Sequence, residues 1–232
     1  MVAAHTRHGG GFNGPHLDYG RPLELSRATA ICLVVDAKSP KLWRASLKGH
    51  YPSVAPLLNA DVEKMDDMIA LNITALTRLA YAAAPAFVAR AAGVLNNLSS
   101  VLALAPERFN ASYSATKAYI LNFSLTLHQE LSPSGVQVQV VLPGATRTAI
   151  WARAGIEVAS LPASRLMEVD EMVDAALVGL DRRELVTIPS LPDIADWEAY
   201  TAARLHLGPN LSLNHAADRY KTVDSTRPSR AR

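Results

Sequence analysis

Tyr113 and Lys117 lie four residues apart in a stretch of sequence with helical periodicity. On a helix, this spacing places both side chains on one face and within reach of each other. A tyrosine with its usual pKa of about 10 exchanges protons poorly at neutral pH, and a neighbouring cation favours its phenolate form. Lys117 is therefore expected to lower the pKa of Tyr113. Taken alone, the pair also fits a packed tyrosine beside a solvated lysine, because this spacing is frequent on amphipathic helices.

Two long helices are predicted, one of which carries this pair. The first begins at Asn59 or Asp61, either of which can cap it, and continues to about Arg90 through apolar residues at spacings of three and four. Pro85 lies within it and is expected to kink it or split it in two, because proline removes a backbone donor and crowds the preceding turn. The second helix covers residues 112–131 and positions the tyrosine and the lysine.

Short apolar runs between the helices predict buried strands at residues 94–99, 136–142 and 185–188. Further helices are expected at residues 169–181 and 194–207. Helix and strand alternate at lengths typical of a parallel sheet with crossover helices, so the predicted fold class is α/β. An earlier apolar run, residues 28–35, fits either a buried strand or a turn of core helix.

Four motifs have the order and spacing of the short-chain dehydrogenase/reductase family. They are LNITAL with Asn72, NNLSS ending at Ser100, YSATK from Tyr113 to Lys117, and LPGATRT from Leu142 to Thr148. The step of 13 residues from Ser100 to Tyr113 matches the family distance, which selects Ser100 over Ser99. Over about residues 57–207, the sequence resembles this family. The resemblance implies a Rossmann-like, doubly wound parallel sheet with helices on both faces.

The resemblance also implies hydride transfer between NAD or NADP and a small-molecule carbonyl or alcohol substrate. Tyr113 would act as the general acid or base, assisted by Lys117, which would also bind the nicotinamide ribose. Ser100 would hold the substrate oxygen. Asn72 would interrupt its helix and help to hold a water that links Lys117 to solvent. A tolerated polar residue in the middle of a helix is the alternative for Asn72.

A cofactor contact is implied at the turn after residues 136–142, where glycine lets the backbone pass close to a ligand. The threonines of this turn could bond the nicotinamide carboxamide or a phosphate, or have ordinary loop roles. Residues 151–167 are expected to cover the substrate, and their apolar side chains favour an apolar or aromatic one. The predicted cofactor-binding residues are Tyr113, Lys117, Pro143, Gly144, Thr146 and Thr148.

The first 56 residues depart from the family pattern. The glycine-rich motif T-G-x-x-x-G-x-G, which places the pyrophosphate at a helix N-terminus, is absent. HGGGFNG at residues 8–14 has glycines but no flanking strand or helix and is interpreted as an irregular leader. We therefore expect an atypical or truncated segment at residues 1–56, a catalytic region at 57–213 and a flexible tail at 214–232. Missing first strands would expose a sheet edge unless residues 28–36 cover it.

Composition narrows the class of partner. The formal net charge is only +2, and the scattered basic residues predict neither a nucleic acid nor a membrane as partner. The single cysteine, Cys32, forms no internal disulfide and fits the cytoplasm, and no cysteine and histidine spacing predicts a metal site. The resemblance implies a homodimer or homotetramer. The alternative function is a catalytically impaired remnant that only oligomerises through the two long helices.

Overall fold

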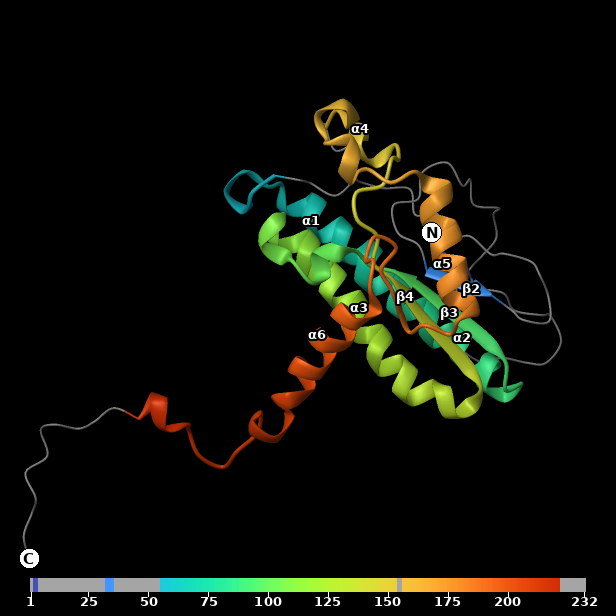
Figure 1. Ribbon diagram of the computed structural model, residues 1–232, viewed down its shortest axis with the longest axis vertical. Coiled ribbons are helices and arrows are strands. Elements are labelled where there is room, and N and C mark those ends of the chain that lie inside the picture. The colour runs from blue at the N-terminus through green and yellow to red at the C-terminus, as the bar shows by residue number, and fades with distance from the viewer. Residues whose placement is uncertain (1, 4–31, 36–54, 154–155, 222–232) are drawn as a thin grey trace, which may run out of the picture. The chain divides into compact units, whose positions relative to one another are not determined.

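The computed structural model describes residues 2–3, 32–35, 55–153 and 156–221 (Figure 1). The chain divides into two compact units, residues 1–190 and 191–232. The strands of the first unit are β1 (Val2–Ala3), β2 (Cys32–Val35), β3 (Gly93–Leu98), β4 (Val136–Val141) and β5 (Val186–Thr187). Its helices are α1 (Val62–Ile69), α2 (Leu76–Ala89), α3 (Ala111–Leu131), α4 (Ile150–Arg153) and α5 (Val169–Asp181), and the second unit contains α6 (Ile194–His206). The domain boundaries expected at residues 57 and 213 stay predictions.

The five strands form one sheet in the order β1-β2-β3-β4-β5. The pairs β3–β4 and β4–β5 are parallel, and α3 and α5 connect them in sequence. These elements confirm the predicted strands and helices from residue 94 to residue 188. The pair β1–β2 is parallel, whereas β2 runs antiparallel to β3. Residues 32–35 therefore form a strand, one of the two alternatives for this run, and cover the edge of β3.

Helices lie on both faces of the sheet (Figure 1). On β3, Asn97 Nδ2 donates to Ser124 Oγ in α3 at 2.9 Å, whereas the adjacent Asn96 bonds the side chain of Gln139 in β4. Gln139 Nε2 in turn donates to the carbonyl oxygen of Ala176 in α5 at 2.9 Å. Since neighbouring strand residues point to opposite faces, α3 and α5 cover opposite faces. The doubly wound arrangement is confirmed.

The first long helix has an interruption, but not at the proline. Asp61 caps α1 by accepting from the backbone nitrogen of Glu63 at 3.0 Å. A π-helical segment, Ala70–Ala75, then separates α1 from α2, and α2 continues through Pro85. The predicted split at Pro85 is therefore wrong. Pro85 and Tyr81, whose carbonyl would receive the missing N–H, are both exposed, so water can replace that bond.

The described residues nearer the two ends of the chain include β1 and α6. β1 was not predicted, because a strand of 2 residues is too short to show a hydrophobic period. The glycine-containing residues 8–14 lie outside the described residues. In the second unit, the predicted helix at 194–207 is confirmed, and Asp193 caps α6 by accepting from Ala195 N at 2.9 Å.

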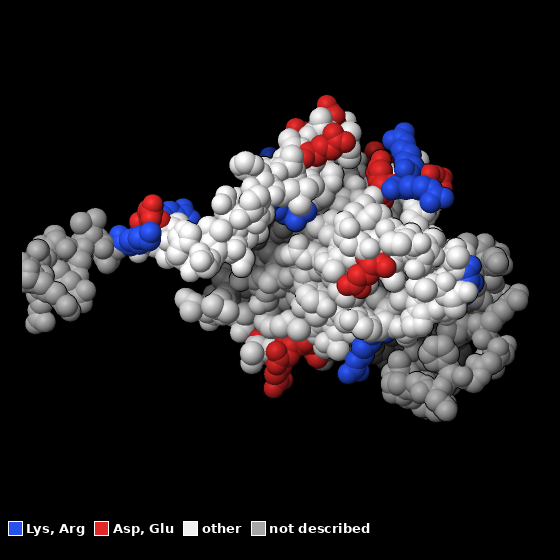
Figure 2. All heavy atoms as spheres, turned by 90° about the horizontal axis from the view of Figure 1, so that it is seen from below, with Lys and Arg blue, Asp and Glu red and all other residues white. Residues whose placement is uncertain are grey.

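The described residues contain neither a membrane-spanning helix nor a cluster of metal ligands. No helix among them is both long enough and apolar enough to cross a membrane. No group of three or more His, Cys, Asp or Glu side chains among them could hold a metal ion. On the face shown in Figure 2, the Lys and Arg side chains of the described residues stand in separate groups rather than in one basic patch.

Candidate active site

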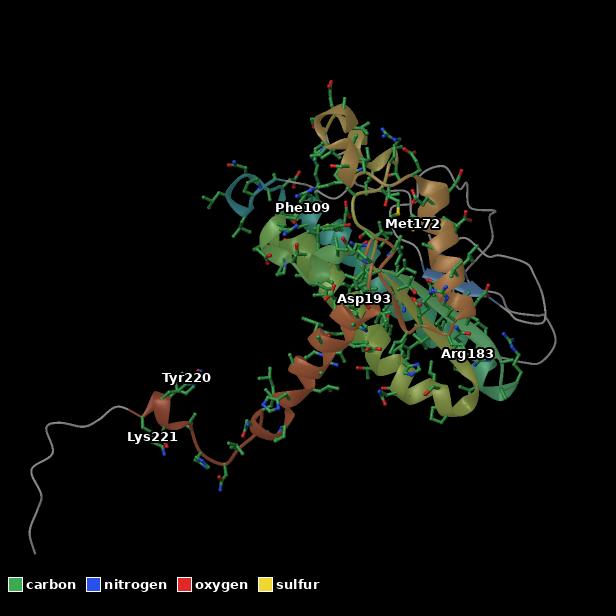
Figure 3. All side chains as sticks on the ribbon, viewed as in Figure 1. Phe109, Met172, Arg183, Asp193, Tyr220 and Lys221 are labelled. Carbon is green, nitrogen blue, oxygen red and sulfur yellow. The ribbon has the colours of Figure 1, made fainter. Side chains whose placement is uncertain are left out.

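The first turn of α3 holds Tyr113 in a defined orientation. Asn110 caps the helix, and its Oδ1 accepts a hydrogen bond from the backbone nitrogen of Tyr113 at 2.8 Å. Phe109, labelled in Figure 3 at this end of the helix, meets the Tyr113 ring edge to face, with 5.4 Å between the ring centroids. The cap and the aromatic contact together restrict where the Tyr113 hydroxyl can point.

The carboxyl end of β3 lies against the same helix. Ser99 Oγ donates to the carbonyl oxygen of Lys117 at 2.7 Å, and Lys117 Nζ donates to the carbonyl oxygen of Leu98 at 3.2 Å. The hydroxyl of Ser100, the next residue, lies near enough to the Tyr113 hydroxyl to favour its ionised form. The structure thus brings together the three side chains predicted for proton transfer. It places Ser100, and not Ser99, at the Tyr113 side chain.

Burial dominates the proton affinities of this cluster. It raises the pKa of Tyr113 to about 12, although the Ser100 hydroxyl acts in the opposite direction. It also lowers the pKa of Lys117 to about 8. The prediction that Lys117 brings the pKa of Tyr113 below its usual value is therefore wrong in this structure. Lys117 Nζ lies over the Tyr113 ring, 5.5 Å from its centroid, so the cation contacts the ring face. Desolvation of the buried hydroxyl sets the direction of the Tyr113 pKa shift.

Asn72 lies in the π-helical segment, so the predicted local interruption of the helix is confirmed. Its side chain is buried, and Nδ2 donates to Thr116 Oγ1 in α3 at 3.0 Å. Thr116 Oγ1 in turn donates to the carbonyl oxygen of Tyr113 at 2.8 Å. Asn72 is thus joined to the tyrosine turn through a residue that the sequence did not single out. The available signal was the position of Thr116 inside the YSATK motif.

The turn after β4 lies beside the end of β3. The carbonyl oxygen of Pro143 accepts from Val101 N at 3.0 Å and from Ser100 Oγ at 3.5 Å. A Cβ built on Gly144 would meet nothing nearer than Ser190 Oγ at 3.9 Å. Among the described residues, the backbone at Gly144 therefore leaves space for a ligand to approach.

The two threonines of this turn differ in their surroundings. Thr146 is buried, its Oγ1 donates to the carbonyl oxygen of Gly144 at 3.2 Å, and its own carbonyl accepts from Trp151 Nε1 at 2.7 Å. Thr148 is exposed, and its Oγ1 accepts from Ile150 N at 3.4 Å at the start of α4. Thr146 thus stands with Pro143 and Gly144 at the buried part of the turn, and Thr148 lies on the loop that follows.

These groups fit the nicotinamide end of a dinucleotide. Lys117 Nζ has three donor hydrogens, and its bond to Leu98 O uses one of them, so ribose hydroxyls can be bound by the others. The space at Gly144 and the buried hydroxyl of Thr146 suit the approach of a carboxamide. Residues 8–14, whose glycines are interpreted as part of an irregular leader and not as a pyrophosphate site, lie outside the described residues.

Comparison with known proteins agrees with this geometry. A family profile described as short chain dehydrogenase matches residues 48–158. The solved structure of a short-chain dehydrogenase from Sphingobium yanoikuyae in complex with NADPH is 50% identical, with a TM-score of 0.71, and the match covers 75% of this chain and 67% of that one. The bulky-bulky ketone specific alcohol dehydrogenase from Comamonas testosteroni is 40% identical, with a TM-score of 0.66, over 75% of this chain and 65% of that one.

A curated relative is less similar than these two structures, and a smaller share of its length is matched. The NADPH-dependent 1-acyldihydroxyacetone phosphate reductase of Schizosaccharomyces pombe is 28% identical over 185 residues, which are 70% of this chain and 62% of the relative. The chain therefore spans less than two thirds of the length of this relative.

Proposed function

Because this chain belongs to the short-chain dehydrogenase/reductase family, we propose that it transfers a hydride between NAD or NADP and a carbonyl or alcohol substrate. The observation that carries the proposal is the junction of β3 and α3. There the Ser100 hydroxyl lies beside the Tyr113 hydroxyl, and Lys117 is buried over the Tyr113 ring. Acid, hydrogen-bond donor and cation thus meet at one point, as general acid catalysis on a carbonyl oxygen requires.

The protonated state of Tyr113 favours the reduction of a carbonyl over the oxidation of an alcohol. A hydroxyl with a pKa of about 12 keeps its proton at neutral pH, so Tyr113 is ready to act as an acid. A reduced nicotinamide nucleotide, when bound, would supply the hydride for the carbonyl carbon. Ser100 Oγ donates a hydrogen bond to the substrate oxygen, and Tyr113 transfers its proton to that oxygen as the C–O double bond becomes single. Lys117, whose pKa is about 8, is cationic at neutral pH and stabilises the phenolate that remains.

The proposed cofactor contacts are those of Lys117, Tyr113 and the turn from Pro143 to Thr148. NADPH is the first nucleotide to test, because a relative with 50% identity was solved with it. We propose an apolar ketone as substrate class, because apolar residues such as Trp151, Ile156 and Leu166 in the segment between β4 and α5 are half-buried. A cytoplasmic location and a homodimer or homotetramer remain predictions.

The test is nucleotide binding and ketone reduction by the purified chain and two matched tyrosine variants. Tyr113→Phe removes the proposed acid, whereas Tyr81→Phe removes the hydroxyl of an exposed tyrosine on α2. We expect Tyr113→Phe to lower turnover about 100-fold or more, the usual contribution of general acid catalysis, with NADPH affinity retained. Tyr81→Phe should match the wild type.

Two results would contradict the proposal. If neither NADPH nor NADH binds at millimolar concentration, the chain is not a dinucleotide-dependent enzyme. If ketone reduction survives in Tyr113→Phe, the proton comes from another group. Binding is followed by fluorescence titration and turnover by loss of NADPH absorbance.

A further inference from the structure

Thr116 links Asn72 to the turn of α3 that carries the proposed acid. Its Oγ1 donates to the carbonyl oxygen of Tyr113 at 2.8 Å and accepts from Asn72 Nδ2 at 3.0 Å. Thr116 is 1% exposed and Asn72 is 4% exposed, so bulk water does not compete for these bonds. We propose that Thr116 is a positioning residue that holds Asn72 and the Tyr113–Lys117 turn in the arrangement needed for proton transfer. The inference rests on the proposed function.

The hydrogen bonds of Thr116 can run in one direction only. A hydroxyl has one proton to donate, and the carbonyl of Tyr113 can only accept. The Thr116 oxygen is therefore left as an acceptor toward Asn72, and the amide of Asn72 must present its Nδ2. Thr116 thus selects one of the two orientations of the Asn72 amide. A valine of the same shape cannot make this selection.

The segment that Thr116 holds is irregular. Asn72 lies in the π-helical segment Ala70–Ala75, a kind of interruption that is rare and often found at functional sites. The bond from Asn72 to Thr116 crosses from this segment to the first turns of α3. Lys117 follows Thr116 directly, and its Nζ reaches the carbonyl oxygen of Leu98 at 3.2 Å. A change in this turn therefore alters the surroundings of the Lys117 ammonium.

Ser124 provides an internal control in the same helix. Its Oγ donates to the carbonyl oxygen of Ile120 at 2.7 Å and accepts from Asn97 Nδ2 at 2.9 Å. The residue is fully buried. Like Thr116, Ser124 donates to a carbonyl of its own helix and accepts from an asparagine amide. Its asparagine lies in β3, however, and the helical turn is not the one that carries Tyr113. Ser124→Ala therefore measures what such a link contributes to stability alone.

The experiment compares Thr116→Val, Thr116→Ser and Ser124→Ala in ketone reduction and in thermal unfolding. Thr116→Val should lower kcat about tenfold, as expected for loss of one hydrogen bond that orders the site, while KM for NADPH changes less than about twofold. The pH profile of kcat should also move. Thr116→Ser keeps the hydroxyl, so its kcat and pH profile should match those of the wild type. Ser124→Ala should lower Tm and leave kcat and its pH profile unchanged.

A double-mutant cycle tests whether Thr116 acts through Asn72. In an Asn72→Ala background, Thr116→Val should reduce kcat little further, because no amide remains to be oriented. Additive losses, or equal losses of kcat in Thr116→Val and Ser124→Ala, would show a general structural role and overturn the inference.

A second readout needs no turnover. The titration of Lys117, followed by NMR of lysine labelled at Cε without substrate, should shift in Thr116→Val and stay in place in Ser124→Ala. An unmoved titration in Thr116→Val would overturn the inference. If the titration shifts but the wild type reduces no carbonyl, the proposed function fails while the positioning role of Thr116 is upheld.

Discussion

Burial of Lys117 makes the stability of the fold depend on pH. Its pKa falls from 10.5 to about 8, so between these values the unfolded chain holds a proton that the folded chain has released. The free energy of unfolding therefore increases as pH rises through this window, by on the order of 3 kcal/mol from this group. Tyr113 acts in the opposite direction from 10.0 to about 12, because there the folded chain keeps the proton.

Urea unfolding across the alkaline range checks this expectation. The stability should rise above the pKa of Lys117 and fall again as the unfolded tyrosine ionises. In Lys117→Met the rise should be absent, because the titrating group has been removed. A wild type whose stability stays flat above pH 8 would show that the Lys117 ammonium is solvated.

The sequence predicted which residues meet at the site but not their proton affinities. The spacing of Tyr113 and Lys117 predicted that these two lie together on one helix face, and the family resemblance added Ser100 to them. The direction of the Tyr113 pKa shift depends on desolvation by the whole fold, which no local pattern shows. Thr116 was missed because a hydroxyl inside a helix normally bonds its own backbone, and its contact with Asn72 spans 44 residues of sequence.

At the scale of elements, α5 is attached to the sheet by polar side chains. Gln139 Nε2 donates to Ala176 O at 2.9 Å and to Thr187 Oγ1 at 2.8 Å, and Gln137 Nε2 donates to Leu180 O at 2.7 Å. The alternation VQVQVV predicted the strand correctly. It could not show that the glutamines face a helix, because alternating polar residues are equally typical of a solvent-exposed face.

Gly179 allows α5 to approach β5 this closely. Figure 3 labels Met172 in the first turn of α5 and Arg183 just after its last residue, and Gly179 lies buried between them in sequence. A Cβ at Gly179 would overlap the side chain of Thr187 and come within 2.9 Å of Glu184 Oε2. Thr187 cannot turn away without losing its bond to Gln139. Gly179→Ala should therefore lower the free energy of unfolding by about 2 kcal/mol, the usual cost of overpacking.

Gly208→Ala is the matched control, because a Cβ at that position would meet no atom within 4 Å. It should leave the free energy of unfolding near the wild-type value. Both variants are compared by urea unfolding with a common m-value. Equal stability of the two alanine variants would mean that α5 can shift on the sheet at little cost.

The interruption of the first long helix also shows what local pattern can and cannot predict. The sequence predicted a kink or a split at Pro85. Pro85 and Tyr81 are exposed, however, so water can bind the carbonyl that loses its hydrogen bond. The irregular segment lies instead at the buried Asn72, where α1 and α2 pass α3. Tertiary contact, and not backbone preference, decides where this helix departs from regular geometry.

At the scale of the whole molecule, the sheet is completed by a short run near the start of the chain. β2 pairs with β1 on one side and β3 on the other, although the family pattern is not recognisable in this part of the sequence. A run of four apolar residues indicates a strand but carries no information on its direction. The antiparallel pairing with β3 could therefore not be predicted, since long-range pairing determines it.

Leu33→Pro tests whether β2 protects the sheet. Leu33 is paired with Ala3 in β1 and with Asn96 in β3, so proline at this position removes a ladder donor between two strands. We expect the free energy of unfolding to fall by about 3 kcal/mol, and light scattering to show self-association as the edge of β3 becomes available to other chains. Leu213→Pro, at an exposed position outside the helices and strands, should change neither. Wild-type stability in Leu33→Pro would mean that β3 forms a stable edge without β2, and that the first part of the chain contributes nothing to the sheet.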